Sequence, residues 1–119
     1  MKRCGWLMVA LVPFVLFGGC GPKPGTPDTG GKKKLTVCML PKKKGVPYFT
    51  SCAQGAEEAA KELGNVELIY DGPTDGAAEK SASMIEKWTL QGVDVIAVSP
   101  NDPEVVSPAM RKAREKGIK

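Results

Sequence analysis

Histidine is absent from the sequence of 119 residues. Its absence excludes Ser-His-Asp and Cys-His catalysis, and it excludes zinc or haem sites that depend on histidine ligands. The four cysteines show no C-x-x-C spacing, so a structural zinc site is not indicated either. The sequence also lacks paired carboxylates, a nucleophile–base pair and a glycine-rich phosphate loop. It therefore predicts a protein that is not an enzyme and that uses no metal or cofactor.

The excess of basic residues is confined to the amino-terminal part of the chain. The formal net charge is +4 at pH 7. Between Leu35 and Lys119, however, 11 lysine and arginine residues are balanced by 12 aspartate and glutamate residues. The length predicts a single domain, and the balanced charge of that domain gives no support to nucleic acid as a partner.

The first residues have the order of an export signal. A basic start precedes an apolar run at residues 6–17, which is too short to cross a bilayer, since a crossing takes about 20 residues. The segment FGGC at residues 17–20 resembles a bacterial lipobox, with Phe17 where that pattern usually has Leu. The resemblance implies a lipoprotein signal peptide at residues 1–19 and lipidation of Cys20. The alternative is an ordinary signal peptide that ends at an incidental cysteine.

The next segment, GPKPGTPDTGGKKK at residues 21–34, has no apolar residue able to join a core. Such a composition favours a disordered, extended chain. We therefore expect residues 20–34 to form a tether between a membrane-anchored Cys20 and a folded domain, in the periplasm or cell envelope. In that oxidising location Cys38 and Cys52 could form a disulfide, or they could remain two small buried residues.

Residues 35–119 alternate between short apolar runs and amphipathic segments. The pattern predicts strands at 35–40, 66–70 and 93–99, and helices at 48–63, 77–91 and 103–116, with a further strand beginning at Ile118. Strands separated by helices must run parallel. The predicted fold is therefore α/β, with three layers in the order α-β-α around a parallel sheet.

Glycine, aspartate and proline mark the ends of the predicted helices. Glycines at positions 64, 92 and 117 are expected to end the three helices. Asp75 and Asp102 are expected to cap the second and third helices at their amino ends. Pro108 is expected either to bend the third helix or to mark its true start.

An open parallel sheet binds ligands outside the carboxyl ends of its strands. In this sequence those ends lead into the loops at residues 41–47, 71–76 and 99–102, so any site should draw on these loops. Three strands with an open edge are a small body for a stable domain. We therefore expect residues 35–119 to be the incomplete amino-terminal lobe of a longer protein, or a truncated gene product.

Four segments at the strand ends carry a family resemblance. They read LPK at 40–42, GVPYFTS at 45–51, YDGPT at 70–74 and IAVSPND at 96–102. Their order and spacing resemble the type I periplasmic sugar-binding proteins, especially the branch that binds autoinducer-2 or rhamnose. The resemblance implies the substrate-binding lipoprotein of a sugar-type ABC importer, with an ABC permease and the membrane as partners.

The resemblance also implies which residues meet the ligand. Lys42 matches the ligand lysine of the autoinducer-2 branch, and Tyr48 and Phe49 match positions that contact the sugar ring. Asn101 and Asp102 could accept hydrogen bonds from sugar hydroxyls. The alternatives are a solvated Lys42, a core Phe49, a surface Tyr48 and a purely capping role for Asp102.

Val46 stands where the sugar families usually have asparagine, which speaks against a ribose-like ligand.

Two further function classes share this fold. A sensor lipoprotein would present its ligand-bound lobe to a membrane receptor kinase, and the sequence does not separate it from a transport protein. The effector domain of a repressor would begin with a helix-turn-helix segment, whereas this chain begins with an export signal.

Overall fold

The computed structural model describes residues 32–119 of the chain. The predicted signal peptide, Cys20 and most of the predicted tether lie outside these residues. The described part alternates between strands and helices in the order β1 (Leu35–Leu40), α1 (Pro47–Leu63), β2 (Val66–Tyr70), α2 (Ala78–Gln91), β3 (Val95–Val98) and α3 (Pro103–Glu115). Every element predicted in this part is therefore found, apart from the strand expected at Ile118, with its bounds within two residues of the expected ones.

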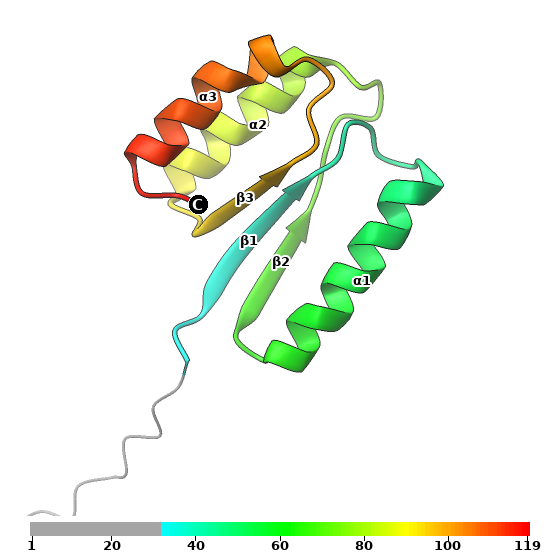
Figure 1. The fold of residues 1–119 in the computed structure, drawn as a ribbon, viewed down its shortest axis with the longest axis vertical. Helices are drawn as coiled ribbons and strands as arrows, with labels where there is room; N and C mark the ends of the chain where they lie inside the picture. The colour runs from blue at the N-terminus through cyan, green and yellow to red at the C-terminus, as the bar shows by residue number, and fades with distance from the viewer. Residues whose placement is uncertain (1–31) are drawn as a thin grey trace, which may run out of the picture. The chain divides into compact units, whose positions relative to one another are not determined.

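The strands of residues 32–119 form one parallel sheet in the order β2-β1-β3. Val37 of the central strand pairs with Leu68 on one side and with Val95 on the other. Helices α2 and α3 pack together over one face of this sheet, and α1 lies over the opposite face (Figure 1). The predicted three-layer α-β-α fold with a parallel sheet is confirmed.

The main hydrophobic core lies between the sheet and the α2–α3 layer. Cys38 and Leu40 of β1 have exposed fractions of 0% and 1%. They share this core with side chains from α2, β3, α3 and the residues that precede β3 or follow α3, namely Ile85, Trp88, Val93, Ile96, Val106, Ala109, Ala113 and Ile118. Burying a leucine or isoleucine side chain contributes roughly 1.5–3 kcal/mol, so Leu40, Ile85 and Ile96 each stabilise the packing of this layer on the sheet.

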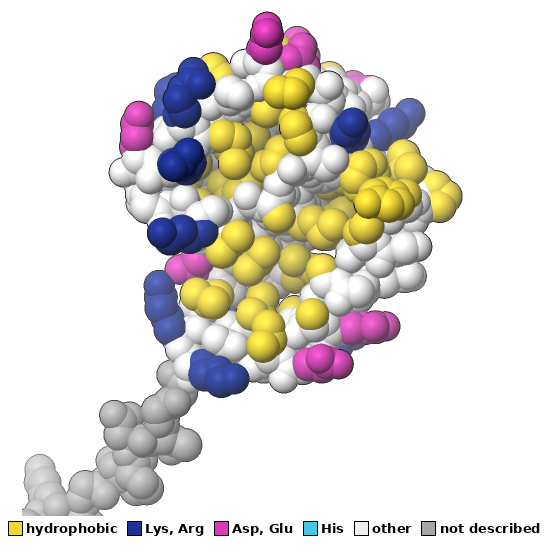
Figure 2. Space-filling view, in the orientation of Figure 1, with side chains coloured by type: hydrophobic (Ala, Val, Ile, Leu, Met, Phe, Trp, Pro, Cys, Tyr) yellow, Lys and Arg dark blue, Asp and Glu magenta, His cyan; other side chains and the backbone are white. Residues whose placement is uncertain are grey.

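The opposite face of the sheet is covered less completely. Successive strand residues point to opposite faces, so Val37 and Met39 point away from the main core, and both are only half-buried. Helix α1 packs against β2 on this face, and Ala53 is the one residue of α1 that is fully buried. A strip of apolar surface therefore remains between α1 and the other helices, as Figure 2 shows.

All three glycines act as predicted at helix ends. Gly64 and Gly92 follow α1 and α2 with φ of 72° and 70°, a left-handed conformation in which residues with a Cβ are strained. At the end of α3, Gly117 follows the C-cap Lys116 with φ of 85°, and its N–H donates to the carbonyl oxygen of Arg114 at 2.9 Å, as in a Schellman motif. Pro108 lies inside α3 and does not mark its start.

The predicted N-caps have different outcomes. Asp102 caps α3 as expected, because its Oδ1 accepts hydrogen bonds from the N–H groups of Glu104 at 2.9 Å and Val105 at 3.3 Å. The prediction for Asp75 is wrong: the N-cap of α2 is Ala77, which has no side-chain cap. Asp75 Oδ1 accepts from the N–H of Ala77 at 3.2 Å, so this carboxylate closes the turn before the helix.

The chain returns to the sheet after α3. The N–H of Lys119 donates to the carbonyl oxygen of Asp94 at 3.0 Å, and the N–H of Ile96 donates to the carbonyl oxygen of Lys119 at 2.8 Å. These two bonds have the pattern of parallel strand pairing. Residues 118–119 are not assigned to a strand, but their backbone begins the pairing with β3 that the sequence led us to expect from Ile118. Within residues 32–119, no helix has both the length and the apolar character that a bilayer crossing requires.

Candidate ligand-binding site at the carboxyl ends of the strands

The loops that follow β1, β2 and β3 meet at one edge of the sheet. We call residues 41–46 the first loop, residues 71–77 the second loop and residues 99–102 the third loop. The first and second loops are in close contact, since a Cβ atom added to Gly72 would lie 2.9 Å from Cδ of Pro41. The N–H of Lys44 also donates to the carbonyl oxygen of Pro73 at 2.9 Å. The edge is therefore a connected surface rather than three separate turns.

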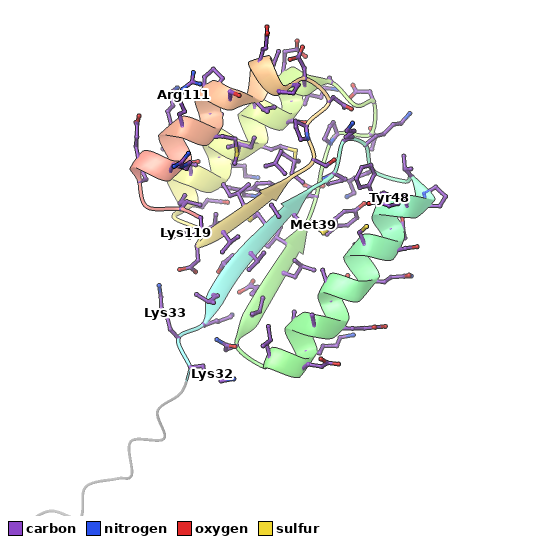
Figure 3. All side chains as sticks on the ribbon, viewed as in Figure 1. Lys32, Lys33, Met39, Tyr48, Arg111 and Lys119 are labelled. Carbon is purple, nitrogen blue, oxygen red and sulfur yellow. The ribbon has the colours of Figure 1, made fainter. Side chains whose placement is uncertain are left out.

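A pocket of about 240 Å³ opens beside this edge, between the start of α1 and the ends of β1 and β3. Its lining is largely apolar and consists of Met39, Leu40, Pro41, Tyr48, Phe49, Cys52, Ala97, Val98 and Ser99. Figure 3 shows Tyr48 at the first turn of α1 and Met39 on the strand beside it. Hence two of the predicted site residues, Tyr48 and Phe49, do lie together in a pocket.

Tyr48 is the exposed aromatic side chain of this pocket. Its exposed fraction is 69%, whereas Phe49 is half-buried. The two rings meet edge to face, with centroids 5.2 Å apart and an interplanar angle of 78°. The pair orients the Tyr48 ring, and an aromatic ring that is both oriented and exposed offers an apolar face to a ligand.

The three lysines of the first loop have different surroundings. Lys44 forms an ion pair with Asp71, with 2.9 Å between Nζ and Oδ1. This hydrogen bond lowers the pKa of Asp71 below its ordinary value, and the N–H of Gly72 adds to the effect. Among residues 32–119, no partner is recorded for the ammonium groups of Lys42 and Lys43, which are both exposed side chains. The ammonium groups of Lys42 and Lys43 are therefore both open to solvent, and a ligand role for Lys42 stays a prediction.

The predicted residues of the third loop already have partners within the fold. Asn101 Nδ2 donates to the carbonyl oxygen of Lys42 at 2.7 Å and to that of Gly76. Asp102 caps α3 through Oδ1. Neither residue lines the pocket, and neither does Lys42. The structure thus places Lys42, Asn101 and Asp102 at the same sheet edge as Tyr48 and Phe49, but outside the pocket itself.

Several residues of the pocket were not predicted from the sequence. Ser99 supplies its hydroxyl directly after β3, and Met39 and Ala97 come from the α1 face of the sheet. Ser99 belongs to the loop at 99–102 that was expected to contribute to a site, although it was not named as a site residue. Cys52 lies three residues after Phe49, so helical spacing places both on one face of α1.

A second depression, of about 530 Å³, lies on the far side of the second loop, beside α2. It is shallower, and it is lined by Gly72, Pro73, Thr74, Glu79, Lys80, Ser83 and Met84. Two of its polar groups are occupied within the protein: Lys80 forms an ion pair with Asp75, and the hydroxyl of Ser83 donates to the carbonyl oxygen of Glu79 at 3.0 Å. The smaller pocket at the strand ends is therefore the better candidate for ligand binding.

The fold and this pocket define a class of protein: a parallel α/β lobe with a candidate ligand site at the carboxyl ends of its strands, where open parallel sheets bind ligands. Residues 37–119 match the family model of the periplasmic binding protein domain. The chain belongs to the periplasmic binding protein family, which confirms the resemblance found in the sequence.

Named relatives support this assignment. The chain is similar to the ribose import binding protein RbsB of Escherichia coli, with 24% identity over 93 residues. This match covers 78% of the chain but only 31% of the relative. The chain thus spans about a third of the length of the curated relatives that it matches.

Solved structures give the same picture. The chain is similar to LsrB from Clostridium saccharobutylicum in complex with AI-2, with a TM-score of 0.68 and 29% identity over 71% of this chain and 26% of that one. It is also similar to a periplasmic solute-binding protein of an ABC transporter from Actinobacillus succinogenes with bound D-allose. The TM-score in that case is 0.67, with 35% identity over 71% of this chain and 30% of the other.

Proposed function

We propose that this chain forms the amino-terminal lobe of the substrate-binding protein of a sugar-type ABC importer. The proposed ligand is a small sugar or sugar-like molecule of the autoinducer-2 or rhamnose kind. The observation that carries the proposal is the pocket between α1 and the ends of β1 and β3, with the exposed ring of Tyr48 at its mouth. Relatives named for ribose import and relatives solved with AI-2 or D-allose support a ligand of this class.

Each proposed site residue has a chemical role. The rings of Tyr48 and Phe49 contact the apolar face of the sugar, because sugar rings pair polar edges with weakly apolar faces. The ammonium group of Lys42 donates hydrogen bonds to sugar hydroxyls. Asp102 uses Oδ1 to cap α3, so its other carboxylate oxygen is free to accept a hydrogen bond from a sugar hydroxyl. Oδ1 of Asn101 accepts a second one.

The proposed location rests on the export signal that the sequence predicts. We propose that Cys20 carries lipid and that the protein works at the cell envelope, where it delivers its ligand to an ABC permease. The tether after Cys20 would then hold the folded part near the membrane. Val46, in the first loop, favours autoinducer-2 or rhamnose over ribose as the ligand type.

Saturation-transfer NMR with the full chain tests the proposal, because the method detects weak binding from the ligand signals. D-allose, D-ribose and L-rhamnose are suitable probes, with a neutral polyol such as glycerol as the control. We expect saturation of the ring protons of at least one sugar and none of glycerol, and we expect Tyr48→Ala to abolish the signal. A sugar signal that survives both Tyr48→Ala and Phe49→Ala would place binding elsewhere and contradict the proposed site.

A further inference from the structure

A single side-chain amide joins the third loop to both of the other loops. Asn101 Nδ2 donates to the carbonyl oxygen of Lys42, 59 residues away in sequence, and to that of Gly76, 25 residues away. Within residues 32–119, no other side chain of the third loop forms hydrogen bonds to both the first and the second loop. The contacts between the first and second loops, by contrast, are several, and they do not involve Asn101.

The chemistry of the amide fixes its orientation. A primary amide has two N–H groups on its nitrogen and an oxygen that only accepts. Both partners of Asn101 are carbonyl oxygens, so the nitrogen must point toward them and Oδ1 must point away. An aspartate at this position has nearly the same shape but no hydrogen to donate, and its charge would face two carbonyl oxygens. The arrangement is therefore specific to an amide.

The backbone of Gly76 shows that the amide occupies a shaped site. Its φ is +78°, and a Cβ atom added to it would lie 3.1 Å from Asn101 Nδ2 and 3.6 Å from the carbonyl oxygen of Lys42. The space that a side chain would use is thus taken by the amide. The backbone of the second loop is built around the side chain of the third.

We propose that Asn101 is a positioning residue, whose amide holds the three loops in one arrangement and so fixes where Lys42 and Asp102 meet the ligand. The next residue, Asp102, is held in place by capping α3, so Asn101 links the backbone of Lys42 to the rigid start of a helix. The effect of Asn101 on sugar binding rests on the proposed function, whereas its role in holding the loops together does not. Besides the direct contact proposed for its Oδ1, which an aspartate would keep, Asn101 acts on ligand affinity through the first and second loops, which its Nδ2 holds.

Hydrogen exchange measured by mass spectrometry on the full chain tests the loop arrangement. In Asn101→Asp we expect exchange in peptides covering the first and second loops to accelerate by about tenfold or more, because both hydrogen bonds from Nδ2 are lost. Exchange in β1 should be unchanged. If Asn101→Asp does not fold, Asn101→Ala removes the same donors without adding a charge.

Asn65 supplies a matched control. Its Nδ2 donates to the carbonyl oxygen of Lys33 at 2.9 Å, at the opposite end of the sheet. Asn65→Asp therefore removes a comparable long-range bond and should leave exchange in the first and second loops unchanged. Equal acceleration in both variants, or none in the variants of Asn101, would overturn the proposal.

Sugar binding separates a positioning role from a merely structural one. We expect the saturation-transfer signal of D-allose at low concentration to fall by about tenfold in Asn101→Asp and to be unchanged in Asn65→Asp. Loosened loops with an unchanged D-allose signal would overturn the positioning role. If no sugar gives a signal with the unsubstituted chain, the proposed function fails, but the exchange experiment still decides whether Asn101 holds the loops.

Discussion

The ammonium group of Lys44 lies 2.9 Å from Oδ1 of Asp71, and this ion pair joins the first loop to the second. The ion pair distinguishes Lys44 from Lys42 and Lys43, the two other lysines of the first loop. The pair lowers the pKa of Asp71 below the ordinary value of 3.8. Its contribution to stability is therefore present above that value and is lost as the pH falls through the lowered pKa.

We expect the pKa of Asp71 to rise toward its ordinary value in Lys44→Met, because the first cause of the lowering is removed. Lys43→Met, in the same loop, should leave it unchanged. Carboxyl-carbon NMR titration measures both. Since both side chains of the pair are partly exposed, the loss of stability at pH 7 should be small, about 0.5 kcal/mol, and should shrink in high salt. An equal rise of the pKa in both variants would show a diffuse positive field in place of a specific pair.

The two cysteines of the described part should differ sharply in reactivity. Cys38 points into the core between the sheet and the α2–α3 layer, where burial raises the pKa of its thiol to about 11. Cys52 lines the pocket on the other face of the sheet. Both are free thiols, and their places on opposite faces explain why they do not pair.

Iodoacetamide at pH 8 should therefore alkylate Cys52 in the native protein and spare Cys38, since only the thiolate reacts and Cys38 is enclosed. Peptide mapping by mass spectrometry distinguishes these residues from the other two cysteines. Both should react after denaturation in urea. A native protein in which Cys38 reacts as fast as Cys52 would show that the α2–α3 layer does not close over the sheet.

The sequence was sufficient to predict the layers of this fold, because they depend on local signals. Apolar runs gave the strands, and Gly64 and Gly92 gave the ends of two helices through their backbone freedom. Asp75 was misjudged because an aspartate two residues before the N-cap has the same local sequence environment as a cap. Which residue caps a helix depends on where the backbone turns, and the composition around Asp75 does not determine that turn.

The candidate site was less predictable, because it is built from contacts between distant segments. Tyr48 and Phe49 could be placed at the pocket, since helix and strand ends bring them to the ligand edge. The partners of Asn101 could not be predicted, since they are backbone carbonyl groups of two other loops. In the same way, the first loop has three consecutive lysines, and only the position of Asp71 decides that Lys44 is the paired one.

Lipidation of Cys20 is a prediction from the sequence, and it concerns residues outside the described part. We expect the mature protein to begin at Cys20 and to carry lipid on it, because small residues precede this cysteine at the end of the apolar run. Mass spectrometry of the membrane fraction measures this directly. Cys20→Ala should release the protein from the membrane and remove the lipid mass. A Cys20→Ala protein that is still membrane-bound and has no other change in mass would contradict the prediction.

The chain by itself should bind sugars weakly. Periplasmic binding proteins of this type are expected to enclose a ligand between two lobes, and one lobe leaves the ligand half solvated. Isothermal titration calorimetry of the chain with D-allose or L-rhamnose should therefore show no binding tighter than about 1 mM, or roughly −4 kcal/mol. A micromolar dissociation constant would mean that this lobe alone forms a complete site.

The last prediction uses the three lysines of the first loop to identify the ligand contact. Lys42→Ala should weaken sugar binding by about tenfold, because a polar ligand loses a hydrogen-bond partner worth roughly 1–3 kcal/mol. Asp102→Ala should do the same. Lys43→Ala changes the local charge equally and should leave the affinity unchanged, which makes it the matched control for Lys42.

Lys44→Ala should also leave the affinity unchanged, because the ammonium group of Lys44 is paired with Asp71 and is not a proposed ligand contact. The initial slope of the saturation-transfer signal against sugar concentration measures all four variants, since at weak binding it scales with the association constant. Equal losses in the three lysine variants, removed by added salt, would show that Lys42 is only part of a positive patch, because salt screens a diffuse field more than a direct hydrogen bond. A neutral sugar held by Tyr48, Phe49 and Asp102 would then account better for the site.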